Sequence, residues 1–157
     1  MAAAKKPTTN INYLEQQADT VRKSLAGNHQ SELFQLAIES GYLAALADGQ
    51  EDAGEREALV KAVETLSSGM IIEWEVETVL ADAYARITAE GNDARAVAIG
   101  TKLKQLGGAE AVLLVAAIVS HATSGVDKKE AQVLEKIGTA AGVPKPQIAN
   151  IVKKARG

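Results

Sequence analysis

The sequence predicts an all-α protein, a compact bundle of about seven or eight short helices built from two pseudo-symmetric helical halves. Three observations lead to this prediction. Alanine is the most frequent residue, whereas the chain of 157 residues holds only one Phe, one Trp and three Tyr, a composition typical of closely packed helices. Apolar residues recur at helical spacing along most of the chain. Two segments, one in each half, resemble each other, and the length suits a single domain.

The N-terminal region is expected to form a mobile tail and then a helix. Residues 1–10 contain little that a core could bury, so we expect a tail there and a single domain over 11–157. A helix over 11–27 carries an apolar stripe that includes Ile11, Leu14, Val21 and Leu25. Two interpretations stay open. The stripe packs on the core of the chain, or these four residues bind a protein partner and the helix is an added docking element.

Two further segments, 31–47 and 110–122, are apolar on nearly every side, as is typical of helices at the centre of a bundle. We expect them to pair there. Gly41 indicates a close approach of two backbones, because glycine inside a helix costs about 1 kcal/mol relative to alanine. The remaining helices are expected at about 52–67, 73–90, 93–106, 127–141 and 146–156. The turns between them are short, which predicts that consecutive helices are antiparallel neighbours.

Composition excludes several classes of protein. Without cysteine there are no disulfides and no thiolate sites, which suits the cytoplasm. The longest uncharged apolar stretch is about half of the roughly 20 residues that span a bilayer, so we expect no transmembrane segment. The glycine-rich nucleotide-binding motifs, the GxSxG motif and the HExxH motif are missing, which favours a non-enzymatic role. Residues 39–64 hold seven acidic and two basic residues, whereas residues 128–157 hold seven basic and two acidic residues. The two oppositely charged segments could therefore each bind a different partner.

An internal repeat brings acidic residues into corresponding positions. Residues 45–63 match 121–138 once a gap of one residue follows the glycine, which pairs Asp52 with Asp127 and Glu55 with Glu130. Each Asp-x-x-Glu precedes an apolar-periodic helix and suits a capping box, in which the two side chains satisfy free amides of the helix.

A cation site is the other interpretation of the same turns. Asp48 stands at the end of a buried helix, where a carboxylate is unfavourable unless a cation or a donor meets it. Carboxylate oxygens are the ligands that calcium and magnesium prefer, and the spacing is not that of an EF-hand. The predicted ligands of a divalent cation such as Ca²⁺ or Mg²⁺ are Asp48, Asp52, Glu55, Asp127 and Glu130. The second turn has Ser124 in place of Asp48, so its share of the site is the weaker one.

The acidic motifs ALADGQEDAGERE and SGVDKKE, each after an alanine-rich apolar helix, resemble those of the tellurite-resistance TerB family. The resemblance covers roughly residues 33–151. It implies a compact helical domain of two related halves and a divalent cation bound at the acidic turns. It also implies a role in tellurite resistance or general stress response through protein–protein interaction, including membrane-associated complexes, with no organic cofactor and no agreed enzymatic activity. Self-association is left open.

The C-terminal residues offer an alternative function. Residues 134–156 reproduce the small-residue and apolar spacing of a DNA-binding helix-turn-helix, with Lys145, Gln147, Asn150 and Lys153 toward the groove. A helical hairpin with Gly142 as C-cap and solvated lysines explains the same pattern. We favour the hairpin, because the acidic remainder of the chain would repel phosphates.

Overall fold

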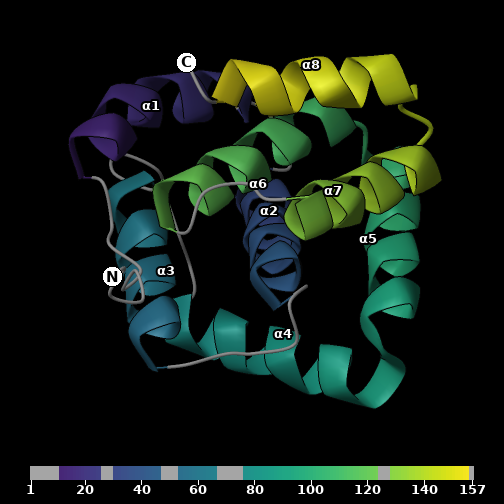
Figure 1. The fold of residues 1–157 in the computed structure, drawn as a ribbon, viewed down its shortest axis with the longest axis horizontal. Coiled ribbons are helices and arrows are strands. Elements are labelled where there is room, and N and C mark those ends of the chain that lie inside the picture. The colour runs from purple at the N-terminus through teal and green to yellow at the C-terminus, as the bar shows by residue number, and fades with distance from the viewer. Residues whose placement is uncertain (1–10, 26–29, 47–52, 67–75, 124–127, 156–157) are drawn as a thin grey trace, which may run out of the picture.

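The computed structural model describes residues 11–25, 30–46, 53–66, 76–123 and 128–155. These residues form helices α1 (Ile11–Ser24), α2 (Gln30–Ala45), α3 (Ala53–Leu66), α4 (Val76–Glu90), α5 (Asn92–Leu106), α6 (Ala109–Thr123), α7 (Lys128–Ala140) and α8 (Lys145–Ala155), as Figure 1 shows. Within the described ranges no strand occurs, and the all-helical fold class is confirmed. The expected tail over 1–10 lies outside the described residues. No helix in these ranges has the length and apolar character to cross a membrane.

The turn between α7 and α8 shows how a glycine ends a helix in this chain. Gly142 has a φ of +87°, a left-handed conformation that is costly for residues with a Cβ. The amide of Gly142 donates to the carbonyl of Thr139 at 3.0 Å, and the amide of Val143 donates to the carbonyl of Gly138 at 2.8 Å. These two bonds form a Schellman motif. The predicted C-cap role of Gly142 is confirmed.

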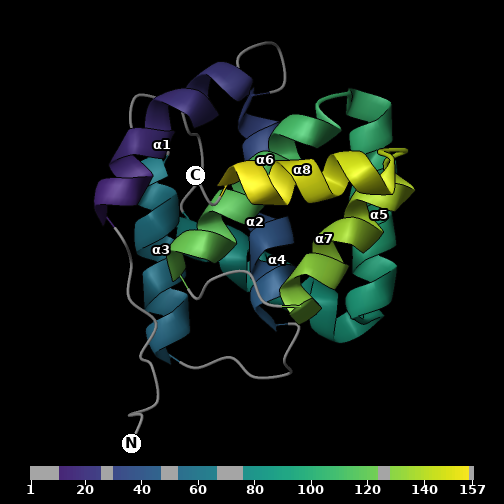
Figure 2. The ribbon, with the colours of Figure 1, turned by 45° about the horizontal axis from the view of Figure 1, so that its top comes forward.

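Helices α2 and α6 form the centre of the molecule (Figures 1 and 2). Phe34 and Ile38 of α2 are fully buried, as expected for a helix that is apolar on nearly every side. A Cβ at Gly41 would lie 3.3 Å from Cγ1 of Val119 and 3.7 Å from the carbonyl oxygen of Ala116, both on α6. The expected pairing of these two helices and the close approach at Gly41 are therefore confirmed.

The contacts between helices repeat from one half of the chain to the other. Helix α1 contacts α3 as α5 contacts α7, and α2 contacts α4 as α6 contacts α8. Across the halves, α3 contacts α6 as α7 contacts α2. Helices α1–α4 thus correspond to α5–α8 in these contacts, with the central helices α2 and α6 exchanged. Helix α1, which the TerB resemblance leaves out, occupies the position in the first half that α5 occupies in the second.

Candidate functional site

The acidic turns predicted to bind a cation connect the two central helices to the helices that follow them. The first turn joins α2 to α3, and the second joins α6 to α7. Asp48, Asp52 and Asp127 lie outside the described residues. Glu55 belongs to the first turn of α3, but its side chain is outside the described part of the structure. Of the predicted ligands, the side chain of Glu130 is the one that the structure describes.

Glu130 is buried in the first turn of α7. Its exposed fraction is 6%. A carboxylate is electrostatically favoured there, because the first amides of a helix point outward with a partial positive charge. Its burial excludes a solvated surface charge and requires that hydrogen-bond donors or a cation hold the carboxylate. A capping role and a cation-binding role both satisfy this requirement. Among the described residues, no group of three His, Asp or Glu side chains could hold a metal ion.

The helices that begin after the acidic turns pack on the central helices of the opposite half. Helix α7 contacts α2, which ends just before the first turn, and α3 contacts α6, which ends just before the second. In Figures 1 and 2 the first turn of α7 lies beside α2. The pairing is reciprocal, since each half supplies one such helix to the other. Each acidic turn therefore leads into a helix that is packed against the other half.

A buried ion cluster that the sequence did not predict joins α2 to α4 and α5. Glu39 is 2% exposed. Its Oε1 accepts from Nη2 of Arg86 at 3.1 Å. Its Oε2 accepts from Nε of Arg95 at 2.9 Å and lies 2.7 Å from Nη2 of the same guanidinium. Nη1 of Arg95 lies 3.5 Å from Glu90. Both oxygens of Glu39 are thus occupied, so this carboxylate anchors α4 and α5 to the central helix and is not placed to act as a base.

A sequence signal for this cluster exists. Glu39 lies in the middle of a segment that is apolar on nearly every side, and a carboxylate in such a helix needs a cationic partner. The identity of the partner could not be read from the sequence, because 17 lysines and arginines were available. The two arginines that pair with it lie 47 and 56 residues further along the chain.

The part of the apolar stripe of α1 that the structure describes is turned toward the chain itself. Val21 and Leu25 are 0% and 1% exposed and belong to the core. They are therefore occupied by contacts within the chain. The side chains of Ile11 and Leu14 lie outside the described part of the structure, so partner binding at these two positions stays a prediction.

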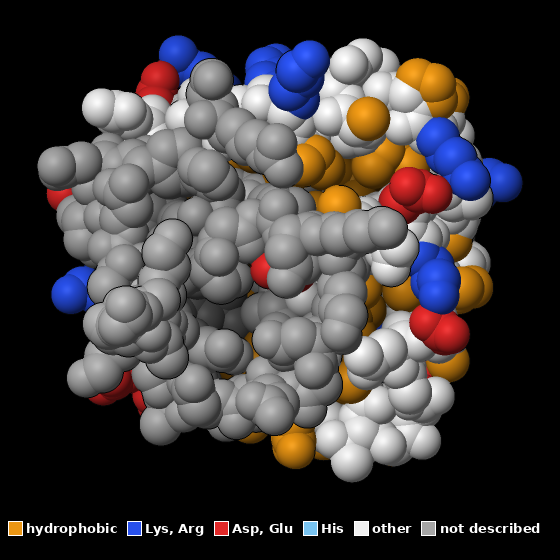
Figure 3. All heavy atoms as spheres, in the orientation of Figure 1, with side chains coloured by type: hydrophobic (Ala, Val, Ile, Leu, Met, Phe, Trp, Pro, Cys, Tyr) orange, Lys and Arg blue, Asp and Glu red, His pale blue; other side chains and the backbone are white. Residues whose placement is uncertain are grey.

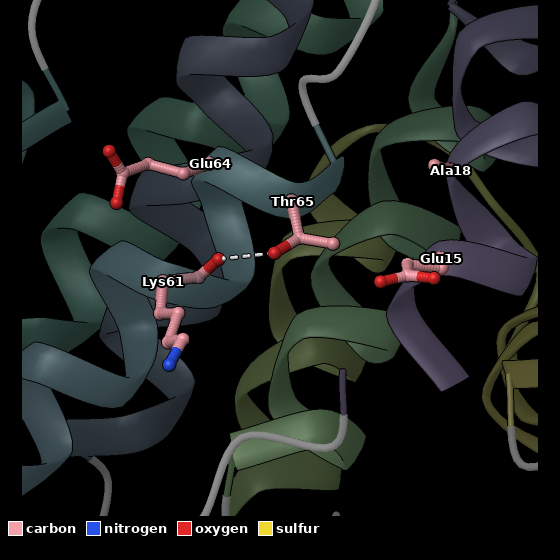
Figure 4. Close-up of a pocket in the computed structure, with 5 residues that line it drawn as sticks. All are labelled: Glu15, Ala18, Lys61, Glu64 and Thr65. Carbon is pink, nitrogen blue, oxygen red and sulfur yellow. Dashed lines mark hydrogen bonds between the residues drawn. The ribbon is translucent and has the colours of Figure 1, made fainter. Parts of the chain in front are cut away.

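Corresponding surface grooves lie in the two halves. The first, of about 570 Å³, lies between α1 and α3 and is lined by Glu15, Ala18, Lys61, Glu64 and Thr65 (Figure 4). Glu15 extends from α1 toward α3, where the hydroxyl of Thr65 donates to the carbonyl of Lys61 at 2.8 Å.

The second groove, of about 640 Å³, lies between α5 and α7. Its lining includes Val97, Lys136, Thr139 and Ala140. Lys136 is the counterpart of Lys61 in the sequence repeat. In the second half this lysine forms an ion pair with Asp93 of α5. The two halves thus present corresponding grooves with different chemistry, since the first is lined by two acids and one lysine and the second by one acid, two lysines and an exposed valine.

The residues proposed to face DNA lie on the exposed side of α8. Lys145, Gln147, Asn150 and Lys153 are all exposed. Carboxylates stand beside two of them, since Lys145 lies 3.4 Å from Glu135 and Gln147 donates to Glu110 at 2.8 Å. Phosphates approaching this side would meet both acids. The helix-turn-helix function stays an untested alternative.

Comparisons with models of known protein families, with characterised proteins and with solved structures gave no significant match.

Proposed function

We propose that this chain is a non-enzymatic binding or scaffold protein, similar to TerB proteins, that acts through protein partners in the response to tellurite or to general stress. In this proposal a divalent cation, Ca²⁺ or Mg²⁺, binds between the two acidic turns, with Asp48, Asp52, Glu55, Asp127 and Glu130 as its ligands. No organic cofactor takes part.

The observation that supports the proposal best is the reciprocal packing of the helices that flank the turns. Helix α7 packs on α2 and α3 packs on α6, so both turns are tied to one central helix pair. Glu130, which has the same repeat position as Glu55, is 6% exposed. A buried carboxylate at the start of α7 is consistent with a ligand that faces inward, toward an ion shared by the two halves.

Thermal unfolding of the full chain with and without metal tests the cation. A ligand present at about a hundred times its Kd stabilises the folded state by about 2.7 kcal/mol. For a domain of this size such a gain raises the melting temperature by roughly 5–10 °C. We expect this shift with Ca²⁺ or Mg²⁺ in the native chain after treatment with EDTA, and we expect it to disappear in Asp52→Asn and Asp127→Asn.

The matched control is Glu57→Gln, which removes one carboxylate from an exposed position of α3 outside the predicted ligand set. This variant should keep the full metal-dependent shift. Equal melting temperatures of the native chain with EDTA and with either metal would leave the capping box as the whole explanation of the acidic turns. Loss of the shift in Glu57→Gln as well would indicate only diffuse attraction of cations to an acidic surface.

A further inference from the structure

The exposed side of α7 carries a surface formed by two adjoining depressions. The first is the groove between α5 and α7 described above. The second, of about 310 Å³, lies between α7 and α8, with Ile148, Ala149, Val152 and Lys153 in its lining. Glu135 and Lys145, which lie 3.4 Å apart, line both depressions, so the two adjoin at this ion pair. We call the surface lined by these residues, which include Val97 of α5 and Lys153 of α8, the α7 groove.

The α7 groove combines apolar side chains with an excess of positive charge. Val97 is 49% exposed and is one of two large hydrophobic residues that stand out in this way within the described ranges. Lys136, Lys145 and Lys153 line the groove, against two acids, Glu135 in the lining and Asp93 beside it as the ion-pair partner of Lys136. The groove is therefore basic in a chain whose net charge is −3. Figure 3 shows hydrophobic side chains between charged ones over the right-hand half of the molecule, where α5, α7 and α8 lie in Figure 1.

The lysines of the groove are only weakly engaged by the chain itself. Lys145 and Glu135 lie 3.4 Å apart, with side chains 72% and 46% exposed. The side chains of Lys136 and Asp93 are 46% and 85% exposed. Exposed pairs of this kind contribute about 0–1 kcal/mol, so an incoming carboxylate could replace the partner at little cost. Lys153 forms no ion pair with any residue that the structure describes.

We propose that the α7 groove binds an acidic amphipathic helix of a protein partner. Helix α7 has 13 residues and is roughly 20 Å long, which suits about four turns of a helix laid along it. The apolar stripe of the partner would cover Val97 and Val152, and its carboxylates would meet Lys136, Lys145 and Lys153. The charge of the groove and its apolar floor match these two features of one ligand.

Other anionic partners fit this surface less well. A nucleic acid would present phosphates to the lysines and would leave the apolar floor unused. An anionic membrane surface requires an apolar helix face turned outward. The apolar face of α8 points inward instead, since Ile148 and Ile151 are 3% and 7% exposed. The proposal rests on the proposed role in partner binding, but it does not depend on a cation at the acidic turns.

The test is a titration of fluorescein-labelled synthetic peptides with the full-length chain, read by fluorescence anisotropy with EDTA present. The probe has leucines at helical spacing and glutamates elsewhere. A peptide of the same composition in shuffled order and a peptide with lysine in place of glutamate are the references. We expect saturable binding of the probe and at least tenfold weaker binding of both references. Duplex DNA and vesicles containing anionic lipid serve as further arms.

Variants of the chain separate the groove from general electrostatics. Lys145→Glu with Lys153→Glu should weaken probe binding by about tenfold, which corresponds to about 1.4 kcal/mol. Lys102→Glu with Lys104→Glu changes the net charge equally at exposed positions of α5 that do not line the groove, and should alter binding by less than about twofold. Ala149→Gln should also weaken binding, because it fills the floor without changing charge.

Several results would overturn the proposal. These are equal binding of the probe and the shuffled peptide, equal losses in the two double-lysine variants, and an unchanged affinity in Ala149→Gln. Absence of probe binding together with tight binding of DNA or vesicles that is lost in Lys145→Glu with Lys153→Glu would assign the surface to those ligands. Because EDTA is present throughout, failure here leaves the cation hypothesis intact, and failure of the metal-dependent thermal shift leaves the groove intact.

Discussion

Replacing Glu39 by glutamine should lower the free energy of unfolding by about 3 kcal/mol. The substitution removes the charge that neutralises Arg95, whose side chain is 13% exposed. Among the described residues, Arg95 then keeps one acidic partner, Glu90 at 3.5 Å. Breaking a buried ion pair in this way costs about 3–5 kcal/mol. The side chain of Arg86 is 42% exposed and can turn to water, so its share is at most about 1 kcal/mol. The glutamine oxygen still accepts one hydrogen bond, which places the loss at the low end of the range.

Urea unfolding of the full chain, followed by the helical signal in circular dichroism, measures this loss. A loss of about 3 kcal/mol should also lower the melting temperature by roughly 6–12 °C. Arg86→Met is the matched control, because it breaks the contact to Oε1 and leaves Glu39 paired with Arg95; we expect a loss of about 1 kcal/mol. Replacing all three residues by Leu or Met should recover most of the stability. Equal losses in Glu39→Gln and Arg86→Met would refute the reasoning that Arg95 and Glu39 form the buried anchor.

Two sets of glycine variants give further predictions, measured by the same urea unfolding. A Cβ at Gly100 would lie 2.5 Å from the carbonyl oxygen of Ile137, which cannot move unless α5 and α7 separate. Gly100→Ala should therefore lower the free energy of unfolding by about 2–3 kcal/mol, although alanine has the higher helix propensity. A Cβ at Gly41 would lie no closer than 3.3 Å to Val119 and 3.7 Å to the carbonyl oxygen of Ala116, so a small shift relieves the contact and Gly41→Ala should change the free energy of unfolding by less than about 1 kcal/mol. Equal losses at both sites would contradict this packing. A Cβ at Gly142 would meet no atom within 4 Å, so only the positive φ opposes Gly142→Ala, which should lower the free energy of unfolding by about 1 kcal/mol. A variant more stable than the native chain would rule out the left-handed cap.

The positions of the helices could be predicted because each depends on neighbouring residues. Gly91, Gly107 and Gly142 have positive φ and stand at three of the expected helix ends. The central pairing of α2 and α6 was also predictable, since a helix that is apolar on nearly every side is stable only when other helices cover it. The internal repeat predicted two halves, and the reciprocal helix contacts agree with it.

The candidate sites could be predicted from the sequence only in part. The repeat pointed to the acidic turns and to Glu130, whose burial no spacing could have predicted. The cluster at Glu39 and the α7 groove were not predicted, because each joins side chains from three helices. The equivalence of α1 and α5 escaped the sequence as well, since the repeat is recognisable over 45–63 and 121–138 and not in these two helices.

By itself the sequence determined the helical class, the helix ends at Gly91, Gly107 and Gly142, the central pair and the doubling of the acidic motif, because these follow from local backbone preferences and from periodic burial. Tertiary structure alone decided which arginines neutralise Glu39, which side of α1 is covered and where apolar and basic side chains adjoin along α7. The physical reason is that an ion pair or a groove depends on the distance between side chains after the helices have packed, and residues 47 and 56 positions apart become neighbours only at that step.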